Sequence, residues 1–377
     1  MSHPPPPLVL SHGAAHRVYT PDGRALIDLE LGFGSAFLGH AHPAVTAALQ
    51  AQAGRLMSCG RHPTPATQRV QALLAARLPA GMRPAGLYST GMEVAEFAMR
   101  IAAVHTGRRE FVGFARSMHG KSAMTAALCW ENAPLHPDGL HVLPFVADAA
   151  EADILQALED RLRGRRVAAV FIEPIQGTHA AHEASTAFYA QALALCRAHG
   201  SLCVFDETLT GLYRTGTAFY ADRLPQGPDI LMFAKSLGNG FPVASLALAE
   251  PVQVPAAALP FSTFSGNAMA LAAVEATLQA MDALPMTALV DTIGAQMAEL
   301  RPRLQASGVV LRGRGALWSL AFDQAATAAR AAEAVVAQGL LVSSGGAAIR
   351  VLPSATLPPE LLATACDALA VGCAAAA

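Results

Sequence analysis

The chain has 377 residues, of which 53% are hydrophobic and only 14% are charged, and its formal net charge is −2. This length accommodates one large and one smaller domain, and the near-neutral charge argues against a nucleic-acid partner or a polybasic membrane surface. No uninterrupted apolar run reaches about 18 residues, so we expect no membrane-spanning helix.

The N-terminal sequence M-S-H-P-P-P-P lacks the basic and apolar regions of a signal peptide. The six cysteines are scattered and match neither a metal-binding spacing nor a disulfide framework. We therefore expect reduced, mostly buried thiols in a cytoplasmic protein. The excess of apolar over charged residues also indicates extensive buried surface, including a large subunit interface.

The N-terminal part of the chain predicts a hairpin and a helix. Residues 1–16 are rich in Pro and His, and we expect them to be irregular. Residues 17–29 alternate around a Pro-Asp-Gly turn, which is typical of a β-hairpin. A glycine-rich loop then leads to a helix over 43–52. His40 and His42 lie two apart without a nearby carboxylate or cysteine, so we interpret them as structural and predict no metal site.

The middle of the chain alternates helices with fully apolar strands, apart from an irregular stretch before residue 153. That alternation is typical of a parallel sheet covered by helices on both faces. The predicted elements are a helix over 64–78, a strand over 85–89, a helix over 92–106, a strand over 110–115, a helix over 153–162, a strand over 167–172, a helix over 186–199, strands over 202–205, 230–234 and 243–249, and a long helix within 261–282.

Polar residues follow five of these strands directly. Because ligands bind at the carboxyl ends of the strands in such sheets, we expect these residues to meet in one crevice. They are Ser89-Thr90-Gly91, Met118-His119, Glu173, Asp206-Glu207 and Lys235.

The C-terminal part changes character and predicts a smaller α+β unit. We expect helices over 287–305, 325–338 and 359–370, with strands over 309–312, 317–322 and 348–352. Combined with the N-terminal hairpin, this unit predicts one small domain from 1–44 and 284–377 and one large domain over 45–283.

Lys235 stands directly after the apolar run I-L-M-F-A. A buried ammonium must be paired or must lose its charge through a lowered pKa, and a neutral lysine can form a Schiff base with a carbonyl. The chain has only two lysines, Lys121 and Lys235, against 24 arginines. Arginine stays protonated and can supply only a charge. A lysine in an apolar setting therefore indicates that its amine is needed. The alternative is a lysine whose ammonium reaches solvent from a strand end.

The Ser-Thr-Gly turn before the helix at 92–106 predicts an anion cradle, because free N–H groups and the positive end of the helix dipole face it. An ordinary helix cap would have the same sequence. A lysine amine, an anion cradle and the buried carboxylate of Asp206 together suit pyridoxal phosphate (PLP), since they match its aldehyde, its phosphate and its ring nitrogen.

From about residue 18 to residue 370 the chain resembles the class III (ω-amino acid type) aminotransferases of the fold-type I PLP enzymes. The resemblance implies a large, mainly parallel seven-stranded sheet domain and a small α+β domain. It rests on L-G-H-A-H-P (38–43), S-T-G-M-E-V-A-E (89–96), M-H-G (118–120), E-P-I-Q-G (173–177), D-E-T-L-T-G-L-Y-R-T-G (206–216), P-D-I-L-M-F-A-K-S-L-G-N-G-F-P (228–242), T-F-S-G-N (263–267) and I-R-V-L-P (349–353).

The resemblance implies a role for each matching residue. Lys235 would form the Schiff base and then move the proton, and Asp206 would pair with the ring nitrogen. Gly91 and Met92 would offer backbone N–H groups to the phosphate. Thr263 would give its hydroxyl to the phosphate of a neighbouring subunit, which makes the active enzyme a homodimer or larger.

Other positions match the rest of the family's site. Arg350 resembles the arginine that binds a substrate carboxylate, for which its planar fork is suited. Phe33 lies where the family places an aromatic residue of the substrate pocket. The positions of Met118, His119, Glu173 and Thr208 match the cofactor site, with Glu173 and Glu207 as supporting acids.

Several residues depart from the family's pattern. Met118 replaces the usual aromatic residue that stacks on the cofactor ring. Thr208 and Leu209 replace a Val or Ile and a residue that is often Gln. Thr178 replaces a Glu found in members that handle glutamate, and Tyr213 replaces a usual Gly. These changes surround the ligand, so we expect a specialised substrate.

The sequence therefore predicts a PLP-dependent transaminase with ping-pong kinetics, acting on small amino acid or amine donors and keto acid or aldehyde acceptors. An aminomutase, racemase or decarboxylase on the same fold is the first alternative, because the ring environment is altered. A non-catalytic relative is the second.

Overall fold

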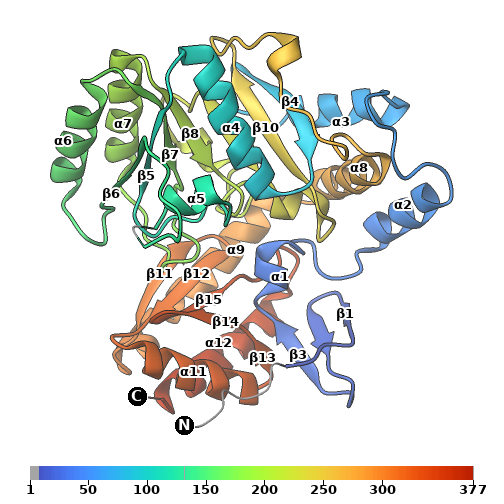
Figure 1. Cartoon of the computed structure of the whole chain (residues 1–377). Helices are drawn as coiled ribbons and strands as arrows, with labels where there is room; N and C mark the ends of the chain where they lie inside the picture. The colour runs from blue at the N-terminus through green and yellow to red at the C-terminus, as the bar shows by residue number, and fades with distance from the viewer. Residues whose placement is uncertain (1–7, 131, 377) are drawn as a thin grey trace.

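The computed structural model describes residues 8–130 and 132–376. A seven-stranded sheet forms its larger part, in the order β4-β10-β9-β8-β7-β5-β6 (Figure 1). Its five strands from β9 to β6 run parallel, and β10 is antiparallel to both of its neighbours. The strands are β4 (Met82–Tyr88), β5 (Glu110–Phe114), β6 (Leu140–Leu143), β7 (Val167–Ile172), β8 (Leu202–Asp206), β9 (Ile230–Phe233) and β10 (Ala244–Ala249).

Helices cover both faces of this sheet, which explains why its central strands are apolar throughout. In β7, Val170 and Ile172 pack in one cluster with residues of α6 and α7, whereas Phe171 packs in another with residues of α4. This alternation is the two-residue period of a strand. The helices of this part are α2 (Pro43–Ala53), α3 (Pro65–Ala75), α4 (Gly91–Thr106), α5 (Ala123–Ala127), α6 (Glu151–Leu162), α7 (Thr186–His199) and α8 (Ala268–Asp282).

Two four-stranded sheets lie below the large sheet in Figure 1, beside helices from the C-terminal part. One has the order β11-β12-β15-β14 and is antiparallel. The other has the order β1-β2-β3-β13 and joins the two ends of the chain. These elements are β1 (His12–Ala14), β2 (Arg17–Tyr19), β3 (Ala25–Asp28), α9 (Met286–Glu299), α10 (Arg301–Gln305), β11 (Val310–Arg314), β12 (Leu317–Ala321), α11 (Ala325–Ala337), β13 (Leu340–Leu341), β14 (Ser343–Gly345), β15 (Ala348–Val351) and α12 (Pro359–Ala374).

The predicted fold class is confirmed, and the differences are local. The helix expected over 287–305 is divided into α9 and α10 next to Pro302, which cannot continue the hydrogen bonds of a preceding helix. The stretch expected to be irregular before residue 153 contains α5 and β6. The segment expected to be irregular at 1–16 contains β1, while residues 1–7 lie outside the described part.

The domain boundaries at 44/45 and 283/284 stay a prediction. Within the described residues, no helix is long and apolar enough to cross a membrane.

Candidate active site

One cavity lies at the carboxyl ends of the parallel strands and draws its lining from six stretches of the chain. It brings together the predicted site residues except Phe33, Glu207 and Thr263. The lining residues are Gly91, Met92, Met118, His119, Gly120, Glu173, Gly177, Thr178, Asp206, Thr208, Leu209, Lys235 and Arg350.

Lys235 follows β9 and begins the 3-10 turn η2 (Lys235–Gly238) with a φ of 41°. A left-handed conformation at a non-glycine residue costs free energy, and such strained residues are enriched at functional sites. Desolvation, together with the charge of Arg350, lowers the pKa of the amine to about 8, although Glu173 and Asp206 oppose the shift. A neutral amine is therefore accessible just above neutral pH.

Asp206 ends β8, and its carboxylate is held in place from two sides. Its Oδ2 lies 2.8 Å from Nδ1 of the buried His119, and its Oδ1 accepts a 3.0 Å bond from the N–H of Thr208. The His119 ring packs against Phe171 with centroids 5.6 Å apart. These contacts fix Asp206, and among the described residues no lysine or arginine lies at ion-pair distance from its carboxylate.

Glu173 follows β7 and joins two loops beneath the cavity. Its Oε2 accepts from the N–H of Met118 at 3.1 Å, and its Oε1 accepts from the N–H of Gly177 at 2.9 Å. Burial and the nearby charge of Asp206 raise the pKa of this carboxyl to about 7. Glu173 therefore positions the backbone on both sides of the cavity.

The N-terminus of α4 faces the cavity through Gly91 and Met92. Thr90 caps the helix by accepting from the N–H of Glu93 at 3.1 Å, and Glu93 accepts from the N–H of Ser89 at 2.8 Å. The N–H groups of the first two helical residues have no acceptor within a helix. They remain available to an anion.

Arg350 lies on β15 and lines the same cavity as Lys235. Its guanidinium donates to Oγ of Ser343 at 3.2 Å and to the carbonyl of Gly177 at 3.3 Å. No carboxylate of the described chain forms an ion pair with it. The charges of Glu30 and Glu173 act on Arg350 from a distance, but its guanidinium has no carboxylate at ion-pair distance within the described residues.

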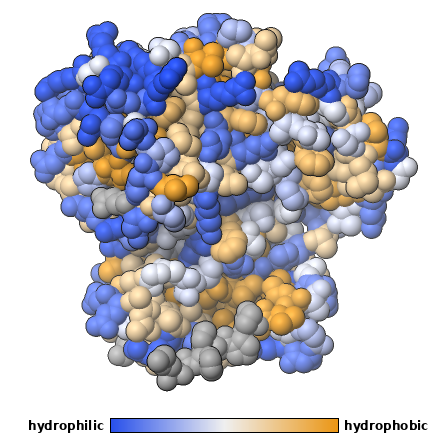
Figure 2. All heavy atoms as spheres, viewed as in Figure 1, coloured by the Kyte–Doolittle hydropathy of each residue, from blue (hydrophilic) through white to orange (hydrophobic). Residues whose placement is uncertain are grey.

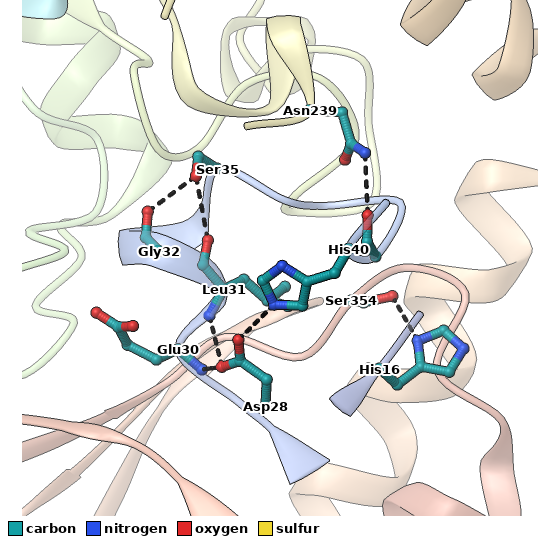
Figure 3. A network of polar contacts seen from close by, with 10 residues as sticks. His16, Asp28, Glu30, Leu31, Gly32, Ser35, His40, Asn239 and Ser354 are labelled. Carbon is teal, nitrogen blue, oxygen red and sulfur yellow. Dashed lines mark hydrogen bonds and ion pairs between the residues drawn. The ribbon is translucent and has the colours of Figure 1, made fainter. Parts of the chain in front are cut away.

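Phe33 lies in the short turn α1 (Leu31–Gly34), outside the cavity lining, with its ring centroid 5.3 Å from the Arg350 guanidinium. It is 58% exposed and has a φ of 57°. The turn that carries Phe33 belongs to the segment whose polar contacts Figure 3 shows. There Asp28 accepts from the N–H groups of Glu30 and Leu31 at 2.7 and 2.8 Å, just before the turn.

The end of the same segment is bound to the loop that carries Lys235. His40 lies 2.6 Å from Asp28, as Figure 3 shows. Asn239 accepts from the N–H of Leu38 at 2.8 Å and donates to the carbonyl of Gly39 at 3.0 Å. The structure thus gives His40 a structural contact, and it links the rim of the cavity to the segment just after Lys235.

Two predicted residues lie elsewhere. Thr263 is exposed in the loop before α8 and does not line the cavity of its own chain. Glu207 points into the core, where it accepts from the N–H groups of Tyr220 and Ala221 at 2.6 and 2.9 Å, and burial raises the pKa of its carboxyl to about 7. Glu207 therefore braces a turn and does not border the ligand.

The unusual Tyr213 adopts a φ of 69°, a conformation that glycine adopts without strain. This explains why the family usually has Gly here. Thr178 and Leu209, which we expected around the ligand, border the cavity, whereas Tyr213 does not. Gly120 and Gly177 also border it and were not predicted as site residues, although they end the M-H-G and E-P-I-Q-G motifs.

The residues of the cavity fit PLP. Two buried polar atoms that border it, Oγ1 of Thr208 and Nε2 of His119, have no partner within the described chain, as expected where a polar ligand binds. Lys235 suits the aldehyde, Asp206 the ring nitrogen, and the free end of α4 the phosphate. The fold and this set of groups define a PLP-dependent enzyme.

Comparisons with known proteins identify the family. The model described as aminotransferase class-III matches residues 1–371. The chain is 33% identical to the 2-aminoadipate transaminase of Pseudomonas putida over 96% of this chain and 95% of that protein. It is 34% identical to the LysW-aminoadipate semialdehyde transaminase of Deinococcus radiodurans over 73% of this chain, but this match spans only 64% of that protein.

A solved structure agrees. The ornithine aminotransferase of Toxoplasma gondii, crystallised with partial occupancy of PLP at its active site, has a TM-score of 0.86 and 28% identity, covering 98% of this chain and 90% of that one. The chain belongs to the class III aminotransferases. It is a PLP-dependent transaminase of small amino and keto compounds, and the alternatives of mutase, racemase, decarboxylase or non-catalytic relative gain no support.

Proposed function

We propose that this enzyme takes its amino group from a donor that carries a carboxylate, which Arg350 binds, while Lys235 performs the chemistry. The observation that carries the proposal is that both side chains line one cavity and that Arg350 has no carboxylate partner within the described chain. A planar guanidinium suits a carboxylate by two parallel hydrogen bonds. The two relatives reported above are named for 2-aminoadipate and aminoadipate semialdehyde, which agrees with this substrate class.

PLP, when bound, supplies an aldehyde that combines with amines and a ring that accepts an electron pair. The chain's own groups then divide the work. Lys235 offers an amine with a pKa of about 8, so its Nζ can take up and release a proton near neutral pH. Asp206, held by His119, keeps a negative charge available to a protonated ring nitrogen. Gly91 and Met92 bind the phosphate through backbone N–H groups.

Replacing Arg350 with glutamine tests the substrate class. We expect kcat/KM for amino acid donors to fall about 100-fold, because a charged hydrogen-bonding fork contributes about 1.5–3 kcal/mol. Amines of the same length without the carboxylate should change little. The measurement is kcat/KM for a panel of such matched pairs, with PLP at saturation.

Arg303→Gln is the matched control. Arg303 is an exposed arginine of α10 that pairs with Asp367 at 2.6 Å. It should leave both members of each donor pair unaffected. An equal loss for both members in Arg350→Gln would contradict the proposed carboxylate contact.

We further propose that the active form is a homodimer in which Thr263 of one subunit serves the phosphate of the other. Exposed apolar side chains lie on both sides of this residue, at Phe261 and Phe264, and also at Leu56 and Met57. The two segments are neighbours, since Cys59 Sγ lies 3.3 Å from the carbonyl of Gly266. Figure 2 shows apolar and weakly polar residues gathered on the right of the molecule, over the α2 and α3 region. Monomers rarely expose such patches.

Subunit mixing tests this arrangement. Lys235→Ala and Thr263→Ala homodimers should each be impaired, the second through an expected ~10-fold weaker affinity for PLP, which corresponds to about 1.4 kcal/mol. In a mixed dimer, one site combines Lys235 from one subunit with Thr263 from the other. Activity should therefore recover at limiting PLP after mixing. No recovery in dimers verified as mixed would show that Thr263 acts within its own subunit.

We propose a cytoplasmic location, with no nucleic-acid or membrane partner. All six cysteines are free and five are buried, which agrees with a reducing compartment.

A further inference from the structure

Arg214 is the largest fully buried side chain of the described chain, with 0% of its surface exposed. No acidic side chain of the described residues forms an ion pair with it. Burying a charge without a counter-charge is expensive, and an apolar side chain of similar volume often serves stability as well or better. A role in stability alone therefore does not explain an arginine here.

The contacts of Arg214 come from four separate segments of the chain. Nη2 donates to the carbonyl of Gly34 at 2.6 Å and lies 3.4 Å from Oγ of Ser236. Nη1 lies 3.3 Å from the carbonyl of Pro353 and 3.5 Å from that of Ala316. The strongest contact is therefore to the turn α1, and the others are longer and weaker.

Three of these four acceptors lie within three residues of the proposed site in the sequence. Gly34 follows Phe33, Ser236 follows Lys235, and Pro353 is three residues beyond Arg350. The guanidinium is thus the point at which the substrate-side segments and the lysine-bearing turn meet. Its carbon also lies 3.8 Å from the centroid of the Phe37 ring, which restricts its orientation.

The backbone of Arg214 is fixed as firmly as its side chain. Its carbonyl accepts from the N–H of Ala316 at 2.9 Å. A Cβ on Gly315 would lie only 2.7 Å from the same carbonyl, so that close approach requires glycine. The preceding Leu212 and Tyr213 both have positive φ angles, which turn the chain inward. The loop is therefore shaped to deliver the guanidinium to this point.

We propose that Arg214 is a positioning residue, whose guanidinium holds the segments carrying Phe33, Lys235 and Arg350 in register and places a positive charge behind the lysine amine. The proposal rests on the roles proposed above for Lys235 and Arg350. The charged groups that act on Lys235 are Arg350 and Arg214, which favour the neutral amine, and Glu173 and Asp206, which oppose it. Losing Arg214 removes one of the two positive charges that favour the neutral amine. It also loosens the packing that keeps the amine away from water.

Amine labelling of the full chain without cofactor measures this effect directly, because Lys235 and the exposed Lys121 are the only lysines. Pulses of acetic anhydride between pH 6 and 11, followed by peptide mass spectrometry, give the labelling midpoint of each lysine. We expect a midpoint near pH 8 for Lys235 in the unsubstituted protein. Arg214→Gln should move that midpoint upward by about half a pH unit or more, because the lost positive charge and the looser packing both favour the ammonium form of Lys235. Lys121 serves as the internal reference.

Arg77→Gln is the matched control. Arg77 is also buried and donates to the carbonyls of Leu73 and Leu278, but its ion pair with Asp282 lies away from the cavity. This variant should lower the melting temperature and leave the Lys235 midpoint unchanged. Arg214→Lys keeps the charge but loses the planar fork, so its midpoint should lie between those of Arg214→Gln and the unsubstituted protein, while kcat/KM for carboxylate donors falls.

A folded Arg214→Gln protein with an unchanged Lys235 midpoint would overturn the proposal and leave Arg214 a purely structural residue. If that variant does not fold, Ser236→Ala, which removes the contact next to Lys235, carries the test. It should raise the midpoint by a smaller amount, and no change would likewise overturn the proposal. If the proposed role of Lys235 itself is wrong, the result is different. Lys235 of the unsubstituted protein would then label like an ordinary lysine, whose pKa is about 10.4.

Discussion

Lys235→Ala should lower the transamination rate by about 10⁴-fold or more and abolish covalent attachment of PLP to the chain. The amine is the only lysine nitrogen lining the cavity, and alanine can neither bind the aldehyde nor move a proton. Borohydride reduction followed by intact mass spectrometry measures the attachment, and steady-state kinetics measures the rate.

Two further variants separate the amine from the charge. Lys235→Arg keeps a cation but lacks a nucleophile, so we expect it to be as inactive as alanine. Lys121→Ala removes the other lysine and should retain stoichiometric attachment of PLP. Attachment that persists in Lys235→Ala and disappears in Lys121→Ala would contradict the assignment.

Asp206→Asn should lower kcat by about 10³-fold, within the range found when a proton-holding or electrostatic group is removed. The amide keeps the shape of the side chain, but it carries no charge with which to keep the ring nitrogen protonated. The amide oxygen can still accept from the N–H of Thr208, and the amide nitrogen can donate to an unprotonated Nδ1 of His119, so the fold should be largely retained. Single-turnover kinetics with saturating donor measures the effect on the chemical step.

Asp229→Asn provides a matched control at the opposite end of the sheet. Asp229 precedes β9, and its Oδ2 accepts from the N–H of Cys203 at 2.8 Å, far from the carboxyl ends of the strands. We expect reduced stability with kcat changed by less than about threefold. If Asp206→Asn kept more than a tenth of the normal kcat, the proposed role of its charge would be wrong.

The residues of the parallel sheet were predictable because β7, β8 and β9 are buried on both faces and read as continuous apolar runs. The polar residue after each run then marks the cavity. β6 was missed because it lies at the sheet edge, where three of its four residues are only half-buried. Its pattern therefore resembles that of a loop.

The contacts among segments outside the large sheet were not predictable. Arg214 is surrounded by carbonyls from positions 34, 316 and 353, and no local pattern shows that they converge. The rim at Phe33 likewise depends on a contact between Asp28 and His40 across the turn. Such contacts follow from tertiary packing, whereas strands and caps follow from local chemistry.

The pairing of β3 with β13 has a consequence for how the molecule is made. Ile27 lies opposite Leu340, so the segment that carries Phe33 obtains this sheet neighbour only after residue 340 has left the ribosome. The strands of the large sheet lie between Met82 and Ala249 and can form earlier during synthesis. Asp206 and Lys235 can therefore take their places in the large sheet well before the rim around them forms. The substrate end of the site is completed last, when β3 pairs with β13.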